Sequence, residues 1–168
     1  VRLPRPQPIK SPRKGVFYWL VFRGTRKGIS NWFYNLNFLP STWPSGGSVH
    51  RGFKSLMLDA WEDIRPQLDS MACPMYYTGH SLGGSLAVLA ATLKEPEAVY
   101  TFGAPKMADA SFIRSVSHIN IYRVVNPRDI VANIPPIPAI LHVGEAHYLK
   151  GGRASNSHRS WSEAPSFL

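Results

Sequence analysis

Residues 79–83 (GHSLG) join two segments of opposite character, and this junction limits the fold more than any other feature of the chain. Residues 75–78 predict a short strand, and the Ala- and Leu-rich residues 85–93 predict a helix. A serine in a tight strand-to-helix turn needs a strained backbone, and small residues two positions away leave room for it. The following helix aims its N-terminal N–H groups at the same point, where they stabilise negative charge. Ser81 is therefore a predicted nucleophile, the alternative being a glycine-flanked serine in an ordinary turn.

Predicted strands and helices alternate along the rest of the chain. Strands are expected at 16–22, 75–78, 98–102 and 119–125, with a final strand or hairpin at 141–149. Helices are expected at 29–36, 53–68, 85–93 and 111–116, and the Ser-, Pro- and Gly-rich residues 41–48 predict a loop. This alternation predicts an α/β fold with a mostly parallel sheet and helices on both faces.

Two segments carry the clearest patterns. Residues 16–22 form an unbroken apolar, aromatic and β-branched run, which predicts a strand buried on both faces. Across residues 53–68, apolar side chains recur every three or four positions, which predicts an amphipathic helix. Pro66 is expected to kink or end this helix near its last turn.

Positive charge is concentrated in the first third of the chain. The formal net charge is +9, and ten Lys or Arg residues precede Asp59, the first acidic residue. Residues 1–15 hold five of these cations and four prolines, which predicts an extended arm ahead of one domain at 16–168. The excess charge fits a solvated face or attraction to an anionic lipid surface. No nucleic-acid-binding motif accompanies it, so nucleic acid is not an expected partner.

The composition narrows the class of protein further. The 168 residues are 44% hydrophobic and 17% charged, and no apolar run reaches the roughly 18 residues that suggest a membrane span, so a soluble domain is expected. Cys73 is the single cysteine, which excludes an internal disulfide and a multi-thiolate zinc site. No apolar segment follows the basic N-terminal residues, so no signal peptide is predicted, although a chain that starts at Val1 says little about secretion. Compartment and oligomeric state stay open, and secretion or peripheral membrane attachment would both fit.

A serine nucleophile needs a base, and the base needs an acid that orients it. With this kind of turn, the three residues follow in the order Ser, Asp, His. Asp129 comes just past the strand at 119–125, where the site residues of open α/β sheets gather. Asp109 is instead expected to begin a helix, and Glu145 to lie in a hairpin. Asp129 is thus the predicted acid, the alternative being a cap for the turn at Pro127.

Six histidines compete for the role of base. His80 is expected to point away from its neighbour Ser81, and two others precede the acid, namely His50 and His118. His142 and His147 lie in a strand-like segment and suit structural roles. His158 lies in a Gly-, Ser- and Asn-rich tail that can return over the sheet edge. Chain order alone favours His158 without excluding the other two that follow the acid.

Seven segments together resemble the class 3 lipases, the family of the fungal triacylglycerol lipases within the α/β-hydrolase superfamily. In family order they are VFRGT at 21–25, NW with NL at 31–36, VHRGF at 49–53, GHSLGG at 79–84, TFGAPK at 101–106, YRVV through DIV and IPP at 122–136, and HRSW at 158–161. The resemblance implies a compact α/β-hydrolase fold. It departs from the family in lacking the helical segment that usually precedes the first matched strand, in a short stretch between acid and histidine, and in Asn31, where many relatives have Asp.

The resemblance also implies a role for each matched position. Ser81 is expected to be the nucleophile, Asp129 the acid and His158 the base. The oxyanion hole is expected to be formed by Thr25 and the backbone N–H of Leu82. A lid that closes the site in water and contacts lipid when open is expected from the apolar stripe Ile29, Trp32, Phe33 and Leu36, the alternative being an ordinary core helix.

The implied activity is hydrolysis of carboxylic ester bonds in acylglycerol lipids through an acyl-enzyme, with no metal or organic cofactor. A phospholipase or galactolipase acting on membrane lipids is the alternative enzyme, and a non-catalytic lipid-binding module is the alternative outside enzymes. All three triad residue types are present, which favours an enzyme, and labelling with a fluorophosphonate separates the two classes. The expected partners are a lipid ester substrate and a lipid–water interface or anionic membrane surface.

Overall fold

The computed structural model describes residues 16–24, 39–127, 129, 135–150 and 153–154. Six strands form one sheet in the order β1-β4-β5-β6-β7-β8, and β2 pairs with β3 in a separate hairpin. The first five strands of the sheet are parallel, and β8 is antiparallel to β7. The strands are β1 (Tyr18–Phe22), β2 (Pro40–Thr42), β3 (Ser48–His50), β4 (Met75–His80), β5 (Ala98–Phe102), β6 (Ile121–Val125), β7 (Glu145–Lys150) and β8 (Arg153–Ala154).

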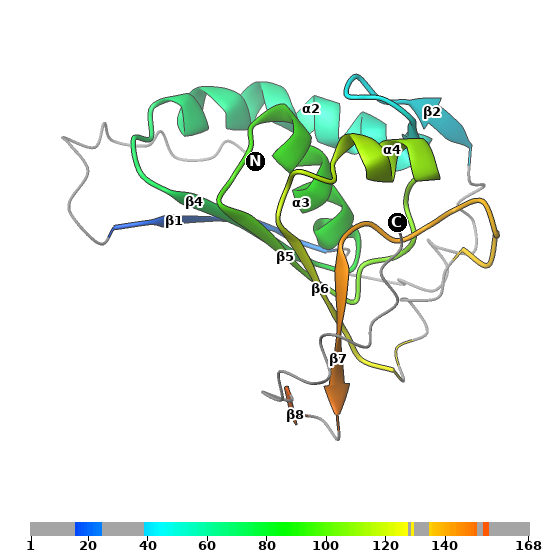
Figure 1. The fold of residues 1–168 in the computed structure, drawn as a ribbon. Coiled ribbons are helices and arrows are strands. Elements are labelled where there is room, and N and C mark those ends of the chain that lie inside the picture. The colour runs from blue at the N-terminus through cyan, green and yellow to red at the C-terminus, as the bar shows by residue number, and fades with distance from the viewer. Residues whose placement is uncertain (1–15, 25–38, 128, 130–134, 151–152, 155–168) are drawn as a thin grey trace.

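Three helices are described, and all of them lie on the same side of the sheet (Figure 1). They are α2 (Arg51–Asp69), α3 (Leu82–Leu93) and α4 (Ala110–Ser115). The alternation of strands with helices confirms the α/β fold and the mostly parallel sheet expected from the sequence. Helices were expected on both faces of the sheet, whereas the described helices cover one face only. The expected helix at 29–36 falls outside the described residues, as does the arm at 1–15.

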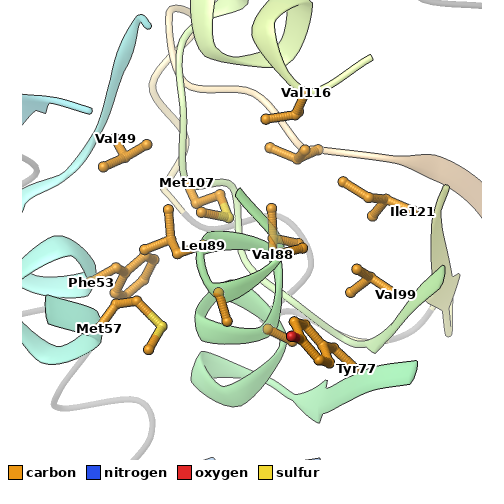
Figure 2. Packing of buried hydrophobic residues seen from close by; sticks show 14 of the residues in the cluster. Val49, Phe53, Met57, Tyr77, Val88, Leu89, Val99, Met107, Val116 and Ile121 are labelled. Atoms are coloured by element: carbon orange, nitrogen blue, oxygen red, sulfur yellow. The ribbon is translucent and has the colours of Figure 1, made fainter. Parts of the chain in front are cut away.

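The core lies between this helical layer and the sheet, and Figure 2 shows its packing. Helix α2 contributes Phe53 and Met57, each at most 1% exposed, because its apolar positions recur on one stripe. Helix α3 is buried along most of its length, and its small side chains let it approach the sheet closely. The sheet meets the helices with Tyr77, Val99 and other side chains from alternate strand positions.

Two expectations about the N-terminal half are wrong in part. Strand β1 is not buried on both faces, since Trp19 and Val21 are 48% and 66% exposed while the alternate Phe22 is buried. The stretch expected as one loop at 41–48 is instead the turn of the β2–β3 hairpin with parts of both strands. Strands β2 and β3 have three residues each, which is too short for an alternating pattern to be recognised in the sequence.

Helices α2 and α4 begin at side chains that accept backbone N–H groups. Asp109 begins α4 as expected, because Oδ1 accepts the Phe112 N–H at 2.8 Å and Oδ2 accepts the Ser48 N–H at 3.0 Å. At α2 the acceptor is Nδ1 of the buried His50, 3.0 Å from the Gly52 nitrogen and 3.4 Å from the Phe53 nitrogen. An imidazole nitrogen accepts only when it carries no proton, so this cap requires neutral His50.

We expect His50→Ala to lower the free energy of unfolding by about 1 kcal/mol, because a helix loses its N-cap acceptor. His50→Asn supplies another good N-cap acceptor and is expected to lose less. Burial lowers the pKa of His50 from its ordinary value of 6.5. The stability from neutral His50 is therefore present above pH 6.5 and lost as pH falls below it. Urea unfolding at several pH values checks this, and an identical pH dependence in wild type and His50→Asn would contradict it.

Candidate active site

Ser81 connects the end of β4 to the start of α3 through a strained backbone. Its φ of 56° and ψ of −126° make it the one non-glycine residue with positive φ among those described. The turn is held by the Ser81 N–H, which donates to the Phe102 carbonyl at 2.9 Å, and by the Ser81 carbonyl, which accepts the Gly84 N–H at 2.9 Å. Such a conformation costs on the order of 1–3 kcal/mol and is found mostly at functional sites.

The glycines around Ser81 allow α3 to approach two strands at once. A Cβ added at Gly79 would overlap the backbone of Gly83, the second residue of α3. A Cβ added at Gly83 would overlap the carbonyl of Phe22, at the end of β1. Glycine is therefore required at positions 79 and 83, because backbone atoms contact each other there and any side chain would prevent this contact.

The Ser81 side chain is buried at the N-terminus of α3. The residue is 1% exposed, and its hydroxyl oxygen forms no hydrogen bond with any described group. Leu82 begins the helix, so its N–H has no acceptor within α3 and lies at the positive end of the helix dipole. This arrangement suits an oxyanion forming beside Ser81.

Asp129 and Ser81 lie at the same edge of the sheet, because both follow the carboxyl ends of parallel strands. Its N–H donates to the Asn126 carbonyl at 2.9 Å in the turn that follows β6. Gly103, which follows β5 with φ of 54°, lies against the carboxylate, since an added Cβ would be 2.5 Å from Oδ2 of Asp129. The same Cβ would be 3.7 Å from Nε2 of His80. The ends of β4, β5 and β6 therefore bring His80, Gly103 and Asp129 together.

Sequence reasoning missed this position of His80. It predicted only that the side chain points away from Ser81, which fits an exposed residue at the end of β4. The alternation of side chains along β4 indicates which face of the sheet His80 occupies. Its neighbours also depend on the pairing of His80 with Phe102, and that register is known only from the structure.

The described histidines that competed with His158 lie in other places. His147 is buried in β7 and follows His80, Phe102 and Val124 along one register row. Three strand spacings separate it from His80, or about 14 Å. Burial is the main cause that lowers the pKa of His147. His142 precedes the amino end of β7. His118 is exposed, and its Nε2 lies 3.8 Å from Oε2 of Glu95. His158 itself is outside the described residues.

Thr25 and the expected lid residues Ile29, Trp32, Phe33 and Leu36 are also outside the described residues, but both flanks of their segment are described. Before it, Gly24 packs on the nucleophile turn, where an added Cβ would be 2.7 Å from the His80 carbonyl oxygen and 3.6 Å from Ser81 Cβ. After it, the Leu39 carbonyl accepts the Arg51 N–H at 2.9 Å. The segment at 25–38 therefore leaves and re-enters the described structure at fixed points, the first of them beside Ser81.

Within the described part of the chain, no three His, Cys, Asp or Glu side chains gather where they could hold a metal ion. No described helix is long and apolar enough to cross a membrane. Cys73 is a buried free thiol.

A strained serine between a parallel strand and a helix, with a carboxylate beyond the end of the next strand but one, defines the nucleophile turn of the α/β-hydrolase class. The family model described as "Lipase (class 3)" matches residues 19–139. The chain belongs to the class 3 lipase family.

Individual relatives agree with this assignment. A lipase of Rhizomucor miehei is 36% identical over 154 residues, covering 78% of this chain and 41% of the relative. A secreted mono- and diacylglycerol lipase of Fusarium solani is 32% identical over 142 residues, covering 74% of this chain and 41% of the relative. The chain thus spans about two fifths of the length of both relatives.

Solved structures share the fold. The native Rhizomucor miehei lipase propeptide complex superposes with a TM-score of 0.68 at 33% identity, covering 78% of this chain and 48% of that one. A triacylglycerol lipase whose catalytic centre is formed by a serine protease triad superposes with a TM-score of 0.68 at 31% identity, covering 79% of this chain and 57% of that one. These structures confirm the expected α/β-hydrolase fold.

We expect Gly103→Ala to reduce the reactivity of Ser81 toward a fluorophosphonate, because the new methyl group would displace the Asp129 carboxylate. A misplacement of about 1 Å in such a site can cost about 100-fold in rate. Gly46→Ala is the matched control, since Gly46 also has positive φ, at 115°, but an added Cβ meets only Ser115 at 3.5 Å or beyond. Both variants place an alanine at positive φ, which costs about 1–2 kcal/mol of stability in each. Equal labelling rates in the two variants would show that Gly103 does not position the acid.

Proposed function

We propose that the protein is a serine hydrolase that cleaves carboxylic ester bonds of acylglycerol lipids. The observation that carries this proposal is the strained Ser81, whose buried hydroxyl stands at the N-terminus of α3, at the sheet edge where Gly103 lies against the Asp129 carboxylate. A merely structural serine in such a turn would gain nothing from its backbone strain, whereas a nucleophile needs it to stand above the sheet.

The proposed reaction proceeds through an acyl-enzyme. His158 accepts the proton of Ser81 as Oγ attacks the ester carbonyl, and Asp129 orients the imidazole and stabilises its charged form. His158 then returns the proton to the leaving alcohol. Water, activated by the same imidazole, releases the fatty acid and restores Ser81.

We assign the oxyanion hole to the Leu82 N–H and to Thr25. Support for Leu82 comes from its place as the first residue of α3. Support for Thr25 comes from Gly24, the preceding residue, which packs on the backbone of His80 and on the Cβ of Ser81. A single oxyanion donor contributes about 3–4 kcal/mol to lowering the barrier, so both residues are expected to affect turnover more than substrate binding.

Acylglycerols are the proposed substrates because the relatives are named for them: one acts on mono- and diacylglycerols, and another is a triacylglycerol lipase. The same Fusarium relative is named as secreted, so we propose secretion for this protein as well. A phospholipase or galactolipase would use the same acyl-transfer chemistry. Comparing rates on acylglycerols, phospholipids, galactolipids and short soluble esters separates these activities.

We further propose that the segment at 25–38 is a lid whose opening exposes an apolar stripe to lipid. Ile29, Trp32, Phe33 and Leu36 recur at helical spacing within it. Its fixed upstream flank at Gly24 lies against Ser81, so a change in the segment would alter access to the nucleophile. The segment also lies among the ten cations that precede Asp59, which would favour an anionic lipid surface.

A fluorophosphonate probe is expected to label Ser81 in the wild-type chain and to leave Ser81→Ala unlabelled. His158→Ala should label about 10⁴-fold more slowly, because triad residues act as a unit. His147→Ala, a change three strands away from the nucleophile turn, is the control and should label at the wild-type rate. Mass spectrometry of the labelled peptide gives the site and the rate. Normal labelling of His158→Ala with loss in His147→Ala would refute the assignment of the base.

Trp32→Ser is expected to reduce hydrolysis of lipid vesicles more than hydrolysis of a short soluble ester, because only the vesicle requires contact with an interface. The wild-type chain is expected to bind anionic vesicles more tightly than neutral ones, with the difference shrinking in high salt. Co-sedimentation and parallel rate measurements check both points. Equal losses on the two substrates would make residues 25–38 a structural segment, and equal binding to both vesicles would refute the electrostatic contribution.

A further inference from the structure

The face of the sheet turned away from the helices carries a row of aromatic side chains. Successive strand residues point to opposite faces, and Gly79 faces α3, so Tyr76 on the same strand faces the other way. Strand pairing aligns Trp19 with Tyr76, and Tyr100 with Tyr122. Figure 1 shows all three described helices on the opposite side of these strands.

The rings of this row contact one another across the parallel strands. The centroids of Trp19 and Tyr76 are 5.2 Å apart, and those of Trp19 and Tyr100 are 5.8 Å apart. Tyr100 stacks on Tyr122 at 5.2 Å, and Tyr122 lies 5.6 Å from His147. We call these five side chains, together with Phe17, which meets Tyr76 edge-on at 5.8 Å, the aromatic row.

Part of the aromatic row is uncovered within the described structure. Phe17 is 54% exposed and Trp19 is 48% exposed. On the same face, Val21 is 66% exposed and Phe102 is 44% exposed. Parallel sheets are almost always covered on both faces, because their strands are rich in apolar side chains. A continuous apolar surface of this kind marks a site that another segment or molecule occupies.

We propose that the basic, proline-rich arm of the chain at residues 1–15 docks across the aromatic row. The arm joins β1 directly at the end of the row, where Phe17 is the second residue after it. Fifteen residues in a polyproline conformation extend about 46 Å, at about 3.1 Å per residue. Four strand spacings, or about 19 Å, separate β1 from β7, so the arm is long enough to cross the row.

The chemistry of the arm matches the chemistry of the row. Proline-rich segments in the polyproline conformation bind grooves lined by aromatic rings, since their shape is preformed and loses little entropy. The arm has four prolines and five cations, and Arg and Lys are attracted to the faces of Trp and Tyr rings. Glu145, half exposed at the far end of the row beside Tyr122, adds a carboxylate for a cation of the arm.

Tryptic cleavage of the arm tests the proposal without relying on any activity of Ser81. Trypsin cleaves after Lys10 and Lys14, and mass spectrometry follows release of the arm from the native chain of residues 1–168. A docked arm is expected to be cut at least about 10-fold more slowly than a synthetic peptide of residues 1–15, since cleavage requires undocking. Trp19→Thr and Tyr100→Thr should each raise the rate toward that of the peptide, because threonine keeps β-propensity and removes the ring.

Val21→Thr is the matched control, because it changes an exposed side chain on the same strand and face but outside the aromatic row. Its cleavage rate should equal that of the wild type. A second variant with all four arm prolines changed to Ser leaves residues 16–168 intact, and it should be cut as fast as its own matched peptide. Wild-type cleavage at the peptide rate, or protection unchanged by Trp19→Thr and Tyr100→Thr, would overturn the proposal. Protection that rises with protein concentration would also overturn it, by indicating that a second copy covers the row.

Discussion

The close backbone contact between α3 and the strands beneath it is the constraint on which the rest of the structure depends. Gly83 touches the carbonyl of Phe22 and the backbone near Gly79, so the helix start is fixed relative to β1 and β4 together. With the helix held there, the connection from strand to helix passes through Ser81 in a strained conformation with positive φ. The orientation of the nucleophile and the position of the positive helix end thus follow from one contact.

The sequence predicted the parts of this fold that carry a long or chemically specific pattern. Helix α2 and strand β5 lie where periodicity and β-branched composition placed them, and Asp109 caps α4 as expected. The β2–β3 hairpin was missed, because its pairing depends on partners and not on local composition. The exposure of Trp19 was missed for a related reason, since an apolar strand looks the same in sequence whether or not a layer covers both its faces.

In the candidate site, too, the features that follow from local sequence pattern were predicted and those that depend on strand pairing were not. Ser81 and Asp129 could be proposed from their positions at predicted strand ends, because parallel strands bring those ends to one edge of the sheet. The contact of His80 and Asp129 with Gly103 could not, since it depends on side-chain directions fixed by strand register. Geometry also adds to what chain order shows: two strands lie between those of His147 and His80, whereas chain order alone left His142 and His147 open beside His158.

The two anchored flanks of residues 25–38 have a consequence for how such a protein can diverge. Gly24 is packed on the nucleophile turn, and Leu39 is hydrogen-bonded to the start of α2, so each flank has contacts of its own in the described structure. The entropy of closing a loop grows slowly with length, by about 0.6 kcal/mol for each doubling. A change in the length of this stretch therefore adds little closure entropy to the cost of folding. Under the proposed lid role, substrate preference is then free to evolve from the flank at Gly24 onward while the core remains unchanged.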